Sequence, residues 1–187
     1  FILSKGTSSS KMVNNLMVAA KVGIVILFIV VGAFYVEPTH WTNNFAPTGF
    51  SGVMLAATTV FFAYLGFDAI STSAEETINP EKALPKAIII TMIVCMAFYI
   101  LVCLVLTGVV EYSRLGTGDA LAFVLEEVGQ NKVAGIVSLG AVIGLMAGIL
   151  SFMYAGIRIT YTIARDGLLP ERLTKVNENK VPSTVTW

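Results

Sequence analysis

An uninterrupted apolar stretch covers residues 87–110, and it contains no charged side chain. About 20 such residues are enough for a helix to cross the hydrocarbon core of a bilayer. Since unpaired backbone N–H and C=O groups are costly in lipid, such a span is expected to be helical. Comparable stretches lie at about 12–36, 50–75 and 133–164. The sequence therefore predicts an all-α membrane protein with four transmembrane helices.

The composition agrees with this class and argues against several others. Hydrophobic residues make up 56% of the chain and charged residues 13%, whereas soluble domains carry about 25% charged residues. The net charge is zero, which gives no electrostatic reason to expect nucleic acid as a partner. The one histidine, His40, lies in a polar loop, and no carboxylates are paired within a span. We therefore expect a lipid bilayer around the chain, and no metal site, no cofactor and no enzyme activity.

The second apolar stretch is interrupted. Gly66 and Asp68 break the apolar run before it has clearly crossed a membrane, and two more carboxylates, Glu75 and Glu76, follow. In secondary transporters, a glycine-interrupted span is typical of a broken helix whose freed backbone groups face a substrate. The alternative is a helix that simply ends near Phe67, with Asp68 at the membrane interface.

The first apolar stretch contains a single charge, Lys21. An ammonium group within a membrane costs roughly 2.5–3.5 kcal/mol on insertion scales. One interpretation is that the long side chain snorkels, carrying its charge back to the interface. The other is that Lys21 faces the interior of the helix bundle, as a fixed cation or as a proton carrier.

Lysine and arginine are concentrated in residues 1–11, 76–86 and 165–187. Because basic residues favour the cytoplasmic side, we expect these segments, including the tail 165–187, to be cytoplasmic. Pro80 and Pro85 predict a stiff connector rather than a continued helix before the third span. At about 119–129, apolar residues recur at helical spacing. This pattern indicates an amphipathic surface helix, either a lid or a plain connector.

Two kinds of side chain within the spans predict helix packing. Tyr99 lies in the middle of the third span, where a tyrosine is expected to form a hydrogen bond between helices. Glycines recur at four or eight residues along the fourth span, and small residues at this interval let helices approach closely. They are Gly140, Gly144, Gly148 and Gly156.

Three motifs in the correct order resemble amino acid permeases of the amino acid–polyamine–organocation (APC) superfamily. Residues 62–72 (FAYLGFDAIST), followed by 74–76 (AEE) and 79–80 (NP), are similar to the sixth helix and its loop. Residues 165–170 (RDGLLP) resemble the loop after the eighth helix, and 14–21 (NNLMVAAK) the start of the fifth. The most similar branch is that of the cationic amino acid transporters. The resemblance implies a fragment covering helices five to eight of an inverted-repeat (LeuT-like) fold of roughly twelve helices.

This resemblance implies a function and a set of site residues. The implied function is secondary active transport of amino acids by alternating access across the plasma membrane, coupled to protons and independent of sodium. In the family, the substrate's ammonium group meets free carbonyl groups at the break in the sixth helix. The matching residues here are Phe62, Ala63 and Leu65, with Gly66 beside them, and Phe67 or Phe62 is the implied gate.

The resemblance also implies a role for Lys21, because proton-coupled members of this branch carry a lysine where sodium-coupled relatives bind the ion. Ser151 is the expected hydrogen-bond partner of Lys21. Asp68 is expected either to cap the second half of the broken helix or to form an ion pair. Half of the implied site lies on helices of the same polypeptide that are absent from this sequence. The alternatives to a transporter are a channel and a structural membrane subunit that does not transport.

Overall fold

The computed structural model describes residues 7–42, 48–64, 66–67, 69–71, 74 and 77–170, with side chains from Met12 onward. All regular elements in this part of the chain are helical, which confirms the all-α class. Residues 171–187 of the predicted tail lie outside the described part. The elements in chain order are α1 (Thr7–Ala33), α2 (Thr39–Thr42), α3 (Gly49–Phe61), the 3-10 turn η2 (Phe62–Tyr64), α4 (Pro80–Val109), the 3-10 turn η4 (Tyr112–Arg114), α5 (Ala120–Glu127) and α6 (Asn131–Arg165).

Four segments of the described chain are long and apolar enough to cross a membrane. They are Met12–Ala33, Gly49–Ser71, Pro80–Val109 and Asn131–Arg165. The predicted number of spans is therefore confirmed. The predicted interruption of the second span is confirmed too, because α3 ends at Phe61, well before the apolar segment does.

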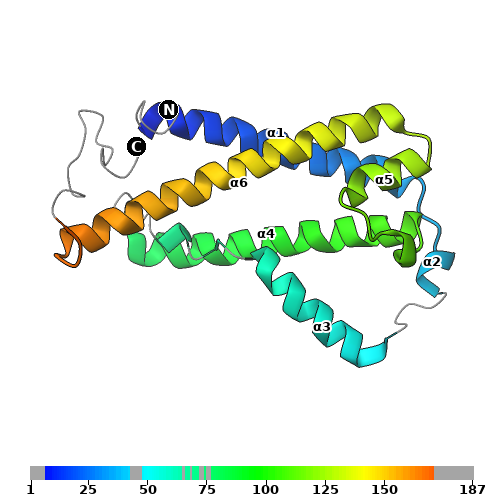
Figure 1. Ribbon diagram of the computed structural model, residues 1–187, viewed down its shortest axis with the longest axis horizontal. Coiled ribbons are helices and arrows are strands. Elements are labelled where there is room, and N and C mark those ends of the chain that lie inside the picture. The colour runs from blue at the N-terminus through cyan, green and yellow to red at the C-terminus, as the bar shows by residue number, and fades with distance from the viewer. Residues whose placement is uncertain are drawn as a thin grey trace.

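The long helices α1, α4 and α6 run lengthwise through the molecule (Figure 1). The helices α1 and α6 lie side by side, and α4 packs along α1. Both α1 and α4 begin at the end of the molecule where α6 finishes, while α2 and α5 lie at the other end. In contrast, α3 slants away from the other helices, and none of its residues is buried.

Glycines bring α6 close to α1. Gly140 and Gly144 are buried, and a methyl group added to Gly140 would collide with the side chain of Ile24 in α1. The predicted packing face is therefore confirmed for these two residues. For Gly148 and Gly156 it stays a prediction, because no atom of the described residues lies within 4 Å of a methyl group added at either position.

The buried core lies where α5 meets the other helices. Its fully buried large side chains include Phe28 of α1, Val137 of α6, and Val124 and Leu125 of α5. The expected surface helix at 119–129 is thus an amphipathic cap whose apolar face closes one end of the bundle. Asp119 links α5 to α6. Its carboxylate accepts hydrogen bonds from the backbone N–H of Ala122 in α5 (3.3 Å) and from the hydroxyl of Ser138 in α6 (2.7 Å).

The third long helix begins earlier than the sequence predicts. The prolines were expected to form a connector, but α4 starts at Pro80 and includes Pro85. The physical reason is that Pro80 occupies the first helical position, where the backbone N–H has no partner within the helix and its absence costs little. Asn79, with a left-handed backbone (φ 54°), turns the chain into this helix.

Candidate functional site

The backbone of the second span leaves the α-helical path immediately after Phe61. Three residues of 3-10 helix follow, and Gly66 then adopts a φ of +112°. Only glycine adopts this conformation without strain. A side chain here would also crowd α6, because a Cβ on Gly66 would lie 3.2 Å from Cζ of Phe152. The α-helix of the second span thus ends at Phe61, earlier than either sequence alternative places its end, while Leu65 and Asp68 lie outside the described residues.

One backbone carbonyl at the break is bound by a side chain from α4. The hydroxyl of Tyr99 donates a hydrogen bond of 3.0 Å to the carbonyl oxygen of Ala63, which confirms the expected interhelical role of this tyrosine. The ring of Tyr99 also meets Tyr64 edge-on, at a centroid distance of 5.1 Å and an angle of 90°. A carbonyl oxygen has two lone pairs, so Ala63 can still accept a second donor.

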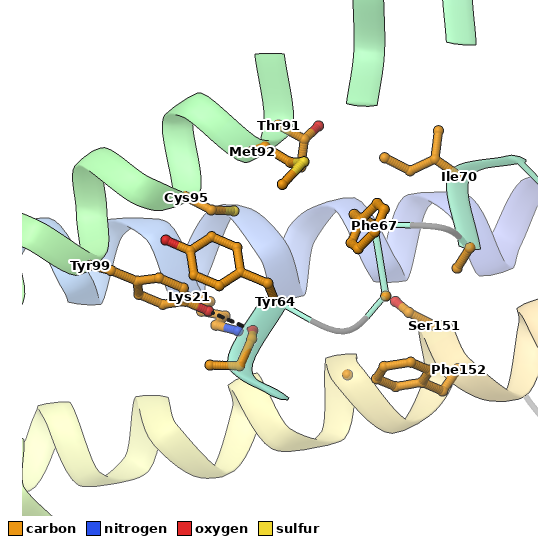
Figure 2. Close-up of a pocket in the computed structure, with 14 residues that line it drawn as sticks. Lys21, Tyr64, Phe67, Ile70, Thr91, Met92, Cys95, Tyr99, Ser151 and Phe152 are labelled. Carbon is orange, nitrogen blue, oxygen red and sulfur yellow. Dashed lines mark hydrogen bonds between the residues drawn. The ribbon is translucent and has the colours of Figure 1, made fainter. Parts of the chain in front are cut away.

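The break opens onto a cavity of about 430 Å³. All four long segments contribute to its walls, as the side chains in Figure 2 show. The lining residues are Lys21 of α1; Ala63, Tyr64, Gly66, Phe67, Ala69 and Ile70 around the break; Thr91, Met92, Cys95 and Tyr99 of α4; and Gly148, Ser151 and Phe152 of α6.

Lys21 lies in this cavity. Its aliphatic stem rests on α6, where a Cβ built on Gly144 would lie 3.3 Å from Cδ of Lys21. Lys21 is the only charged residue among the described residues that line the cavity. Ser151 lines the same cavity, but its hydroxyl donates a 3.4 Å hydrogen bond to the side-chain oxygen of Asn14. The structure therefore brings Lys21 and Ser151 together without a hydrogen bond between them.

The two candidate gate residues occupy different surroundings. Phe67 is half-buried and lines the cavity, as Figure 2 shows. Phe62 is 66% exposed, and its ring contacts Phe61 edge-on at a centroid distance of 6.2 Å. It does not line the cavity. Of the two, only Phe67 is in a position to cover a molecule held there.

Sequence reasoning missed several side chains of the cavity wall. Met92 and Cys95 stand with Tyr99 at intervals of three and four residues, which is the spacing of one helix face, and this periodicity is the signal that identifies them. Phe152 lies four residues after Gly148, on the same face of α6, but its contact with the break depends on how α6 packs against it. No group of three or more metal-binding side chains occurs in the described part of the chain.

A helix that stops within a membrane segment, beside a cavity shared with three other spans, resembles the discontinuous helices at which secondary transporters form their binding sites. Comparison with known proteins gives the family: residues 1–187 match the amino acid permease family along their whole length. The chain therefore belongs to this family, and it is a membrane protein.

Similar proteins have names that refer to transport. The chain is 48% identical over 187 residues to the methylthioribose transporter of Bacillus subtilis (strain 168), covering 100% of this chain and 40% of that protein. It is 45% identical over 189 residues to the branched-chain amino acid permease BcaP of the same organism, with the same coverage. Its identity to the chloroplastic cationic amino acid transporter 9 of Arabidopsis thaliana is 42% over 176 residues, covering 94% of this chain and 31% of that protein.

The chain thus spans 40% or less of the length of these relatives. All three are named as permeases or transporters, in agreement with the expectation that this protein is not an enzyme.

Proposed function

We propose that the full-length protein is a secondary active transporter of amino acids, coupled to protons, independent of sodium and operating by alternating access. One observation carries this proposal: the broken second span and Lys21 of α1 face the same cavity. In such carriers, unwound backbone at membrane depth supplies groups that bind substrate or ion. The remaining walls of the site would come from helices of the same polypeptide that lie outside this chain.

The backbone at the break is suited to an ammonium group. Carbonyl oxygens of Phe62, Ala63 and Leu65 are the proposed acceptors, beside Gly66. Hydrogen bonds from a charged donor are about twice as strong as neutral ones, so a few carbonyl groups can hold a substrate amine. Phe67 is the proposed gate residue, since its ring borders the cavity. Asp68 remains the proposed cap or ion-pair partner.

Lys21 is the proposed proton-coupling group. When protonated, its amine supplies a fixed positive charge within the bundle, where a sodium-coupled carrier would hold the metal ion. When neutral, it can accept a proton from the opposite side of the membrane. Ser151 lines the same cavity, and its hydroxyl is the proposed polar neighbour of the amine. This arrangement removes the need for sodium and couples each transport cycle to a proton.

The charge of the cavity favours neutral amino acids over cationic ones. No carboxylate is among its described lining residues, and Lys21 would repel a second positive charge. Ile70, Met92 and Phe152 offer an apolar surface to a substrate side chain. A neutral thioether sugar is the second candidate substrate, because a relative that shares 48% identity is named a methylthioribose transporter.

We further propose that the protein resides in the plasma membrane, with residues 1–11, 76–86 and 165–187 in the cytoplasm. The arrangement of the helices supports this orientation, because α1 and α4 begin at the end of the molecule where α6 finishes (Figure 1). Lys82, Lys86 and Arg165 lie on the helix ends gathered there, as expected for a cytoplasmic face.

Uptake by the full-length protein in proteoliposomes tests the function. A proton gradient, but not a sodium gradient, should drive accumulation of a labelled neutral amino acid. The Lys21→Ala variant should lose this accumulation and retain exchange of internal for external substrate. Competition by all common amino acids and by methylthioribose then identifies the substrate class. Undiminished proton-driven accumulation by Lys21→Ala would exclude Lys21 from coupling.

Cys95 offers a test of the site itself. It lines the cavity, whereas Cys103, two turns further along α4, does not. In a Cys103→Ser background, substrate should slow the reaction of Cys95 with a maleimide, and the enantiomer of the substrate should protect less. A Cys95→Ser background with Cys103 retained is the matched control, in which substrate should have no effect. Uptake that neither saturates nor selects an enantiomer would indicate a channel, and absence of both uptake and protection a structural subunit.

A further inference from the structure

Two side chains of α1 pack against two glycines of α6. Ile24 packs against Gly140, and Lys21 packs against Gly144. The contact with Lys21 extends along the stem, since a Cβ on Gly144 would lie 3.3 Å from Cδ and 3.5 Å from both Cγ and Cε. The exposed lysine side chain therefore lies in contact with α6, and a Cβ at position 144 would require its Cδ to move by a few tenths of an ångström.

This contact controls where the ammonium group goes. A lysine in an apolar helix can bend its flexible stem toward the headgroups. Here three stem carbons lie close to Gly144, so α6 fixes the course of the stem. The amine instead enters the cavity, where Figure 2 shows Lys21 with Tyr64 and Tyr99.

The next glycine in the row differs from Gly144. Gly148 also lines the cavity, but a methyl group added there would meet no atom within 4 Å. Gly156, two turns further along, is exposed and equally open, and it does not line the cavity. Close packing against the lysine is therefore a property of Gly144 and not of the whole glycine row.

We propose that Gly144 is the positioning residue for Lys21: the bare backbone at this point holds the lysine stem and directs its amine into the cavity. The inference rests on the proposed function, in which Lys21 carries the coupling proton. An alanine at position 144 tightens this contact, so that the stem shifts by a few tenths of an ångström and carries the amine with it. Coupling to protons then suffers while substrate binding by the broken helix persists.

The pH dependence of uptake is an informative measurement because Lys21 has few titratable neighbours among the described residues. Those that line the cavity with it are Tyr64 of η2, and Cys95 and Tyr99 of α4; the described lining residues of α6 include none. Asp68 stands between the lining residues Phe67 and Ala69 in the sequence but outside the described part, so a displaced pH profile is assigned to the lysine only where the Lys21→Ala background abolishes it.

The test compares Gly144→Ala with the wild type in proteoliposomes of the full-length protein. Small misplacements of a functional group cost one to two orders of magnitude in rate, so we expect proton-driven accumulation to fall by about tenfold or more. Exchange should remain within about twofold of the wild type, and the pH of half-maximal uptake should move by about half a unit or more.

Two glycine variants serve as controls. Gly140→Ala collides with Ile24, which lies one turn from Lys21 in α1, so it is the control for a displaced helix and should lower the melting temperature more than Gly144→Ala does. Gly156→Ala adds a methyl group in open space and should behave as the wild type. A Gly144→Ala protein with the wild-type pH profile and accumulation would overturn the inference, as would a Gly144→Ala protein whose melting temperature falls as far as that of Gly140→Ala.

The Lys21→Ala background separates this inference from the proposed function. If Gly144 acts through the lysine, Gly144→Ala no longer shifts the pH dependence of exchange once Lys21 is replaced. If the same shift persists in the Lys21→Ala background, Gly144 acts on packing and the inference fails. If Lys21→Ala alone retains proton-driven accumulation, the proposed coupling role fails first.

A labelling experiment on the wild type tests the inference even if Gly144→Ala does not fold. A membrane-impermeant amine reagent is applied to the full-length protein with and without substrate, and modification of Lys21 is followed by mass spectrometry. An amine held in the cavity should be protected by substrate. Modification of Lys21 at the same rate with and without substrate would mean that the amine lies among the headgroups, and would refute the inference.

Discussion

The hydroxyl of Tyr99 donates a hydrogen bond of 3.0 Å to the carbonyl oxygen of Ala63. This bond joins the middle of α4 to the point at which the second span stops being α-helical. A backbone carbonyl without a partner at membrane depth costs several kcal/mol. Tyr99 therefore stabilises the broken form of the span before any substrate is present.

Tyr99→Phe should destabilise the substrate-free protein more than the substrate-bound protein. The change removes one hydrogen bond, worth about 0.5–1.5 kcal/mol, and keeps the edge-on ring contact with Tyr64. A bound substrate amine can compensate by donating to the carbonyl of Ala63. Melting curves with and without substrate measure the difference. Tyr112→Phe, in the exposed turn η4, is the matched control, and equal losses with and without substrate would contradict the prediction.

The features of this fold that could be predicted are those determined by a short stretch of sequence on its own. Helical spans follow from the length of apolar stretches, because lipid leaves the backbone no other partners. The break was predictable for a similar reason, since Gly66 interrupts a span. The beginning of α4 was not, because a proline disfavours a helix interior but is also common at the first position of a helix, where its missing N–H costs little.

The walls of the cavity depend on packing between helices, which local patterns do not determine. Nothing near Phe152 in the sequence indicates that its ring lies 3.2 Å from where a Cβ of Gly66 would be. Likewise, the spacing of the four glycines in α6 predicts one common face. Only the position of α1 shows that the lysine stem lies beside Gly144, while the space beside Gly148 holds no described atom.

Gly66→Ala should lower both stability and substrate affinity. A residue with a side chain at a φ of +112° stores about 1–3 kcal/mol of strain, and its Cβ would crowd Phe152. Gly167→Ala is the matched control, because Gly167 also has a positive φ (+81°) but has open space around it. A larger loss in melting temperature and affinity for Gly66→Ala than for Gly167→Ala is expected, and Phe152→Leu should recover part of it. Equal losses in the two variants would show that the crowding is unimportant.

Asp119→Ala should weaken the cap formed by α5. The carboxylate is the N-cap of α5 and also accepts the hydroxyl of Ser138, and loss of an N-cap costs about 0.5–2 kcal/mol. Asp119→Asn retains an acceptor oxygen and should recover most of the stability. Melting temperature is the measurement, and substrate affinity should stay constant because Asp119 does not line the cavity. An Asp119→Asn protein as unstable as Asp119→Ala would indicate that the charge, and not the cap, matters.

Gly108→Ala should destabilise the junction between α2 and the end of α4. The carbonyl of Gly108 is one of the last in α4, where helices leave such groups without intrahelical partners. It accepts hydrogen bonds of 2.9 Å from both the backbone N–H of Glu37 and Nδ1 of His40. An added Cβ would lie 2.8 Å from both Cζ2 of Trp41 and Cγ1 of Val36, and such overpacking costs about 1–3 kcal/mol.

The ring of Trp41 is the neighbour whose replacement identifies the cause of this loss. Trp41→Phe removes the hydrogen bond from Nε1 to the hydroxyl of Thr107 (3.2 Å), which is worth about 0.5–1.5 kcal/mol, but it also makes room for a methyl group on Gly108. The double variant should therefore lose less stability than the sum of the two single variants. Gly116→Ala, in open space, should leave the melting temperature unchanged. Strictly additive losses would mean that the ring of Trp41 does not cause the crowding at Gly108, and would leave Val36 as the neighbour responsible.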